Sequence, residues 1–115
     1  MLHASWALVQ LNRIELAMPE HSTPVERREL GAMARYCVTR VEATLGPPDS
    51  WFVRIGNVEG QVACTVVVRD RGCAIETTSF DPDGAVAIWD AVREVEQILR
   101  DVRASRSWRP RRKAA

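Results

Sequence analysis

Hydrophobic residues recur along this chain with two different periods, which separate the expected helices from the expected strands. Between residues 24 and 45 apolar side chains return every three or four positions, the pattern of a helix with one buried face. Thr23, Pro24 and Glu26 introduce this stripe in the order of a capping box with proline at the first helical position, and Gly46 follows it. A second helix with the same spacing is predicted from residue 84 to about residue 104.

Alternating apolar and polar positions predict four strands. One is expected over residues 7–17 and three more over residues 51–55, 62–69 and 73–80, which are joined by short turns. The order β-α-β-β-β-α predicts an α+β fold, in which a four-stranded antiparallel sheet carries two helices packed on one face. The residues expected to face the helices are Val62, Cys64, Val66 and Val68. Those expected on the other face are Arg54, Thr65, Val67, Arg69, Glu76 and Thr78.

Length and composition favour a single globular domain. The chain has 115 residues, of which 46% are hydrophobic and 27% are charged. We expect one domain over residues 1–104 and a basic, flexible tail over residues 105–115. No apolar run is long enough to cross a membrane and the first residues do not resemble a secretory signal, so a cytoplasmic location is expected. The three cysteines show no paired spacing, which fits a reducing compartment.

The sequence carries no recognisable arrangement of residues for catalysis or for metal binding. Its histidines and cysteines lack the grouped spacing of a zinc site, and neither histidine is placed to activate a cysteine. Cys37 and Cys64 lie on apolar faces, which predicts that they pack in the core. Asp81 and Asp83 are placed to cap the second helix rather than to act as general acid and base. We therefore expect neither an enzyme nor a bound cofactor.

Tryptophan is frequent for a chain of this length. Trp51 and Trp89 lie on elements that must bury apolar area, so the tryptophans are expected to fill the core or an interface. Stacking on nucleic-acid bases is the alternative. The other two tryptophans are Trp6 and Trp108.

Positive charge is concentrated at the carboxyl-terminal end of the chain. Residues 100–115 carry six arginines and the single lysine against one acid, whereas residues 1–99 carry nine arginines against fourteen acids. The net charges of these two parts are +6 and −5. Any long-range attraction to phosphate is therefore expected to come mainly from the tail. The composition of the tail suits either an arm that grips polyanions or a solubilising end.

The run DPDGAVAIWDAVREVEQILRDV over residues 81–102, together with the element order and the Thr23-Pro24 helix start, resembles the hibernation-promoting factor and ribosome-associated inhibitor family. Members of this family are also called sigma-54 modulation proteins. In that family a short acidic segment opens the last helix, an Ala-Ile pair follows, and an apolar ladder continues through a Leu-Glu pair. The matching positions here are Asp83, Ala87, Ile88, Val95 and Glu96.

This resemblance implies a cytoplasmic protein that binds the small ribosomal subunit in stationary phase and silences translation, without catalysis. Family members contact ribosomal RNA through basic residues of their helices, notably a Lys and an Arg that flank the Leu-Glu pair. Here these positions hold Glu94 and Gln97, which removes phosphate contacts and adds repulsion, so a shifted or weaker basic surface is expected. The candidate RNA-binding residues are Arg40, Arg54, Arg69, Arg93, Arg100, Arg103, Arg106, Arg109, Arg111, Arg112 and Lys113.

An alternative hypothesis is a protein-interaction or homodimerisation module that kept this fold and lost RNA binding. The acidic body of the chain favours it. Such a dimer would form through the open face of the sheet or through Trp6 and Trp51. Arginines that converge on one face would favour RNA binding, whereas arginines that are dispersed and paired with carboxylates would count against it.

Overall fold

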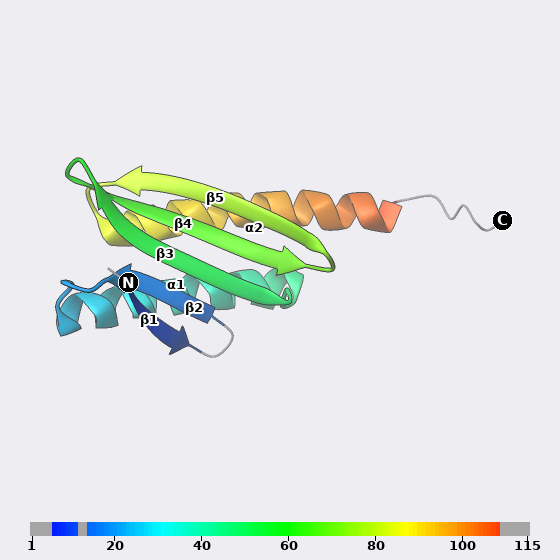
Figure 1. Ribbon diagram of the computed structural model, residues 1–115. Coiled ribbons are helices and arrows are strands. Elements are labelled where there is room, and N and C mark those ends of the chain that lie inside the picture. The colour runs from blue at the N-terminus through cyan, green and yellow to red at the C-terminus, as the bar shows by residue number, and fades with distance from the viewer. Residues whose placement is uncertain (1–5, 12–13, 109–115) are drawn as a thin grey trace.

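One sheet and two helices make up the part of the chain that the structure describes (Figure 1). The computed structural model describes residues 6–11 and 14–108, and the side chains of residues 14–106. The helices are α1 (Pro24–Leu45) and α2 (Gly84–Trp108). The strands are β1 (Trp6–Leu11), β2 (Ile14–Pro19), β3 (Ser50–Val58), β4 (Gln61–Asp70) and β5 (Cys73–Asp81), and they lie side by side in that order.

The predicted α+β class is confirmed, as is the order β-α-β-β-β-α from β2 to α2. The segment predicted as one strand over residues 7–17 forms two antiparallel strands, with Trp6 paired to Pro19 and Leu11 paired to Ile14. The sheet therefore has five strands. Because both strands are rich in apolar residues, their hydrophobic pattern alone did not separate them. Helix α2 continues to Trp108, beyond its predicted end.

The prediction that neighbouring strands are all antiparallel is wrong for one pair. Strands β2 and β3 are parallel, with Ile14 beside Trp51 and Leu16 beside Val53. Helix α1 connects them and carries the chain back along the sheet, and such a crossover lets the next strand run in the same direction. Strands β3, β4 and β5 form the two antiparallel hairpins that the sequence predicts.

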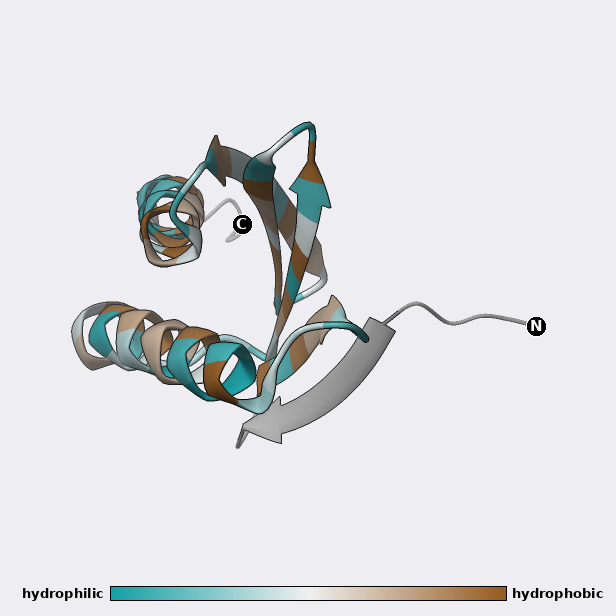
Figure 2. Ribbon diagram, turned by 90° about the vertical axis from the view of Figure 1, so that its left-hand side faces the viewer, coloured by the Kyte–Doolittle hydropathy of each residue, from teal (hydrophilic) through white to brown (hydrophobic). Residues whose placement is uncertain are grey.

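Both helices cover the same face of the sheet, as predicted (Figure 2). The four β4 residues expected to face the helices are buried or packed against the core. On the other face Arg54, Arg69 and Glu76 are exposed. Thr65 lies on that face too but is only 6% exposed, and its hydroxyl is 2.9 Å from that of Thr78 on β5. The side chains of β4 therefore lie on the faces of the sheet that the sequence predicts.

Helix α1 begins as its sequence predicts. The Thr23 hydroxyl accepts a hydrogen bond from the backbone N–H of Glu26 at 3.0 Å, and the Glu26 carboxylate accepts one from the N–H of Thr23 at 2.8 Å. The helix ends at Gly46, whose φ of 82° favours glycine. In the core, Trp51 is 1% exposed and donates from Nε1 to the carboxylate of Glu42 at 2.9 Å. The packing prediction is therefore confirmed for Trp51.

Candidate nucleic-acid interface

A buried carboxylate holds the end of α2 to the body of the domain. Asp70, the last residue of β4, is 2% exposed. Its carboxylate accepts two hydrogen bonds of 3.2 Å from Arg103 and one of 3.0 Å from Arg106. Arg103 also donates to the backbone carbonyls of Leu45 and Gly46, where α1 ends. We call this arrangement the helix clamp, and it engages two of the predicted RNA-binding arginines in contacts within the fold.

The helix clamp also sets the protonation of Asp70. The hydrogen bond from Arg103 is the largest influence and lowers the pKa of the Asp70 carboxyl below its ordinary value. Burial opposes this effect, and the hydrogen bond from Arg106 adds to it. Asp70 is therefore a carboxylate at neutral pH, where it neutralises part of the positive charge near the end of α2.

The middle of α2 carries mixed charge. Arg93 is exposed, while Arg100 pairs with Glu96, one helical turn earlier, at 3.0 Å. Glu94 and Gln97, which stand where the family has cations, are both exposed. Among the predicted cations of α2 that the structure describes, Arg93 is exposed without an ion pair, and Arg100 stays 47% exposed despite its pair.

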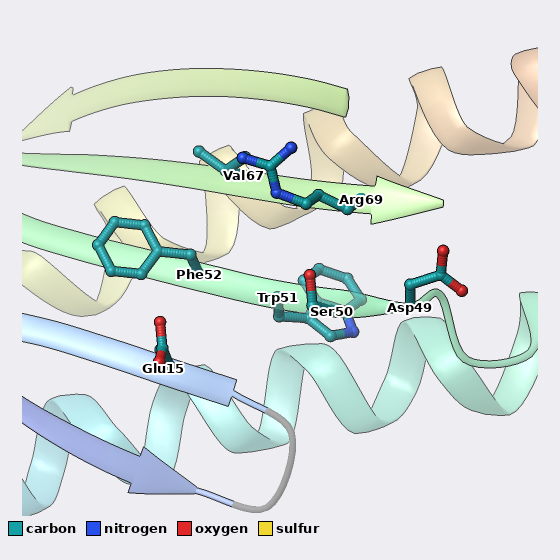
Figure 3. Close-up of a pocket in the computed structure, with 7 residues that line it drawn as sticks. All are labelled: Glu15, Asp49, Ser50, Trp51, Phe52, Val67 and Arg69. Carbon is teal, nitrogen blue, oxygen red and sulfur yellow. The ribbon is translucent and has the colours of Figure 1, made fainter. Parts of the chain in front are cut away.

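Two further candidates lie on the opposite side of the molecule. Arg54 and Arg69 are on the open face of the sheet, which the helices do not cover. A pocket of about 520 Å³ on this face has Arg69 of β4 and Glu15 of β2 on either side of Phe52 (Figure 3). The predicted arginines therefore divide among the open sheet face, the outer side of the helices and the helix clamp, and three of them are paired with carboxylates. Within the described residues the expected convergence on one face is wrong, and this dispersal counts against RNA binding through the predicted set. Residues 109–115, with the remaining four candidates, lie outside the described part of the chain.

An aromatic and cationic cluster joins the two helices on their outer side. The rings of Tyr36 on α1 and Trp89 on α2 are stacked, with centroids 6.5 Å apart and planes inclined by 17°. The guanidinium carbon of Arg40 lies 5.0 Å from the centre of the Trp89 ring, within the range of a cation–π contact. Tyr36 is 56% exposed. We call Tyr36, Arg40 and Trp89 the helix-face stack.

A groove of about 590 Å³ runs along α1 beside this stack. We call it the α1 groove, and its lining residues are Arg27, Arg28, Gly31, Ala32, Arg35, Tyr36 and Thr39. Three of these seven residues are arginines and none is a carboxylate. Arg27 donates to the hydroxyl of Ser22 and to the carbonyl of Glu20, whereas Arg28 and Arg35 are exposed.

Arg28 and Arg35 are not among the RNA-binding residues predicted from the sequence. Their signal was present, because residues seven apart on a helix lie two turns apart on the same side. The glutamates of α1 hid this pattern, because the polar residues of the helix include both signs of charge. Tyr36 belongs to both the α1 groove and the helix-face stack, so the two features form one continuous surface.

The sequence matches no described protein family and no curated protein. Among solved structures, the N-terminal domain of Protein Y from Thermus thermophilus is similar, with a TM-score of 0.61 and 14% sequence identity over 82% of this chain and 99% of that one. The fold is that of the Protein Y N-terminal domain. The resemblance drawn from residues 81–102 is thereby confirmed for the fold.

The Protein Y-like fold places the other candidate chemical groups in structural positions. Burial raises the pKa of the Cys37 thiol to about 11 and that of the Cys64 thiol to about 12, and both side chains pack in the core as predicted. Asp83 accepts from the N–H of Ala85 at 2.9 Å and so caps α2. The described residues contain no group of three or more potential metal ligands. Neither described helix combines the length and the apolar character needed to cross a bilayer.

Proposed function

We propose that this chain is a ribosome-associated factor that silences translation and binds small-subunit ribosomal RNA through the outer side of its helices. The observation that carries the proposal is the continuity of the α1 groove with the helix-face stack on a Protein Y-like fold. The family resemblance of residues 81–102 supports the ribosome as the partner. The proposed role involves no catalysis, and it places the protein in the cytoplasm.

The α1 groove and the helix-face stack together suit the two kinds of group that RNA presents, its phosphates and its bases. Arg28 and Arg35 reach outward along α1 and suit phosphate oxygens, which take charge-assisted hydrogen bonds from guanidinium groups. The exposed ring of Tyr36 suits the face of an unstacked base or a ribose. Arg40 of α1 lies over Trp89 of α2, and Arg93, one turn beyond Trp89, continues the surface along α2.

This assignment differs from the residue set expected from the sequence. Arg103 and Arg106 serve the helix clamp, so we assign these two to folding rather than to RNA, whereas Arg100 pairs with Glu96 on the exposed surface of α2. Basic residues on α1 then supply the positive charge that α2 lacks at Glu94 and Gln97. The basic surface is shifted from one helix to the other.

Co-sedimentation with purified small ribosomal subunits over a range of KCl concentrations tests the proposal. The double variant Arg28→Gln/Arg35→Gln should bind more weakly, and the slope of log affinity against log salt should fall by about two, because two phosphate contacts are lost. The matched control Arg69→Gln/Arg71→Asn also removes two exposed positive charges, but from β4 and its turn. Its slope should stay close to that of the wild type.

A second variant separates stacking from charge. Tyr36→Ala removes an exposed ring and no charge, so affinity should fall about tenfold while the salt slope stays unchanged. Binding that is absent in the wild type, or that does not depend on salt, contradicts the proposal. A tight, salt-resistant dimer without RNA affinity would instead support the protein-interaction module.

A further inference from the structure

The outer edge of β5 is a long strand edge with little to prevent pairing. β5 is the last strand of the sheet, and all nine of its residues pair with β4 in an unbroken register from Cys73 to Asp81. Within the described residues no strand pairs with its other side, and β5 forms the upper border of the sheet in Figure 1. Exposed edges are usually blunted by charged side chains, proline, a bulge or a short length, and of these β5 carries only the charges of Glu76 and of Asp81 at its end.

The side chains of β5 alternate in a way that fits a second copy of the same strand. Ile75 and Thr77 are buried towards the helices, whereas the alternate positions from Ala74 to Phe80 are exposed on the open face. A two-fold axis through Thr77, normal to the sheet, would place each residue opposite its counterpart at the same distance from Thr77. This register keeps every side chain on its present face, and it pairs the full length of both strands.

In this register the exposed side chains are complementary. Phe80, which is 52% exposed, would lie opposite Ala74 of the other copy, so two apolar pairs would be covered. Glu76 would lie opposite Thr78 of the other copy, whose hydroxyl can donate to a carboxylate while it accepts from Thr65. Moving the axis to Glu76 would place two carboxylates directly opposite each other, which disfavours that alternative.

We propose that two copies of this chain associate through antiparallel pairing of their β5 strands around Thr77, which joins the two sheets into one. The proposal goes beyond RNA binding and is independent of it, because the α1 groove lies on the outer side of the helices and not on β5. It also differs from a dimer through the open sheet face, since the contact is made by the backbone of the edge.

The oligomeric state of the full chain, measured by sedimentation velocity from about 1 to 100 μM, tests the proposal, and a wild-type dimer is expected. In the double variant Ala74→Lys/Phe80→Lys, lysines would oppose each other at both pairs and the dimer dissociation constant should rise by about tenfold or more. The variant Ala74→Lys/Phe80→Glu places opposite charges at the same two pairs. Dimerisation should be retained in that variant, which makes it the matched control.

Three results would overturn the proposal. The first is a wild-type chain that is monomeric throughout this range, which would leave the edge to another partner or to none. The second is equal weakening by both double variants, because only the β5 register distinguishes them. The third is loss of the dimer on Phe52→Lys, a change on the open sheet face of β3, two strands away from β5.

The two proposals can fail separately. Arg28→Gln/Arg35→Gln should lose affinity for the small subunit and remain dimeric. Ala74→Lys/Phe80→Lys should dimerise about tenfold or more weakly and keep the salt-dependent binding of the wild type. Circular dichroism checks that both variants are folded, and all four substituted residues are exposed.

Discussion

The helix clamp predicts that the charge of Asp70 stabilises the fold, and Asp70→Asn tests this. The carboxylate is 3% exposed and receives three hydrogen bonds from two guanidinium groups that are themselves 22% and 23% exposed. Neutralising it leaves both guanidinium groups without a counter-charge, although Arg103 keeps its hydrogen bonds to the carbonyls of Leu45 and Gly46. Breaking a buried ion pair in this way costs about 3 to 5 kcal/mol, and we expect the lower value because both arginines keep some contact with water.

The size of the effect is large enough to measure by urea unfolding. A loss of about 3 kcal/mol, with a slope of about 1.5 kcal/mol per M, moves the midpoint down by about 2 M. Asp90→Asn on the exposed side of α2 is the control, and it should change the stability by less than about 0.5 kcal/mol. The reasoning is refuted if the free energy of unfolding of Asp70→Asn differs from that of the wild type by less than about 0.5 kcal/mol.

The effect has a defined pH dependence. The folded pKa of Asp70 lies below its value in the unfolded chain, which is about 3.9, so the charged form stabilises the fold. This contribution is complete at pH values above the unfolded pKa and is lost as the pH falls through the folded pKa. The stability difference between wild type and Asp70→Asn should therefore be constant near neutral pH and shrink below about pH 4.

Three further substitutions or reactions test separate parts of the fold. Thr23→Ala removes the cap of α1 and should cost about 1 kcal/mol in thermal or urea unfolding, and no loss would mean that the capping box contributes nothing. Trp51→Phe keeps most of the buried ring but removes the indole hydrogen bond to α1, so a loss of about 1 to 2 kcal/mol is expected in the same assay, and an unchanged stability would contradict it. With iodoacetamide at pH 8 the folded protein should be modified at Cys73 alone, because Cys37 and Cys64 are buried thiols with raised pKa values. Mass spectrometry showing rapid modification of either would contradict their burial.

The features that are set by residues close together in the sequence were predicted correctly. The start of α1 follows from Thr23 and Glu26, whose side chains reach only three residues along the chain. The two hairpins follow from alternation and tight turns, and the facing of β4 follows from the same alternation. Each of these signals is contained within a few residues, so no knowledge of the distant chain was needed.

The features that depend on contacts between residues far apart in the sequence were not predicted. Nothing near Arg103 in the sequence indicates that it binds Asp70, which lies 33 residues earlier, so the arginine was interpreted as open to RNA. The parallel pairing of Ile14 with Trp51 depends on how α1 returns the chain to the sheet. The α1 groove is an intermediate case, because helical geometry places Arg28 and Arg35 on one side without any tertiary information.

The parallel pairing of β2 with β3 has a consequence for the order of folding. Strands β3, β4 and β5 are joined by tight turns, so their contacts close short loops, whereas the pair Ile14 and Trp51 closes a loop that includes the whole of α1. Closing the longer loop costs more chain entropy, and contacts between distant residues slow folding. The hairpins with α2 should therefore assemble first, and the amino-terminal strands should dock last as the rate-limiting step.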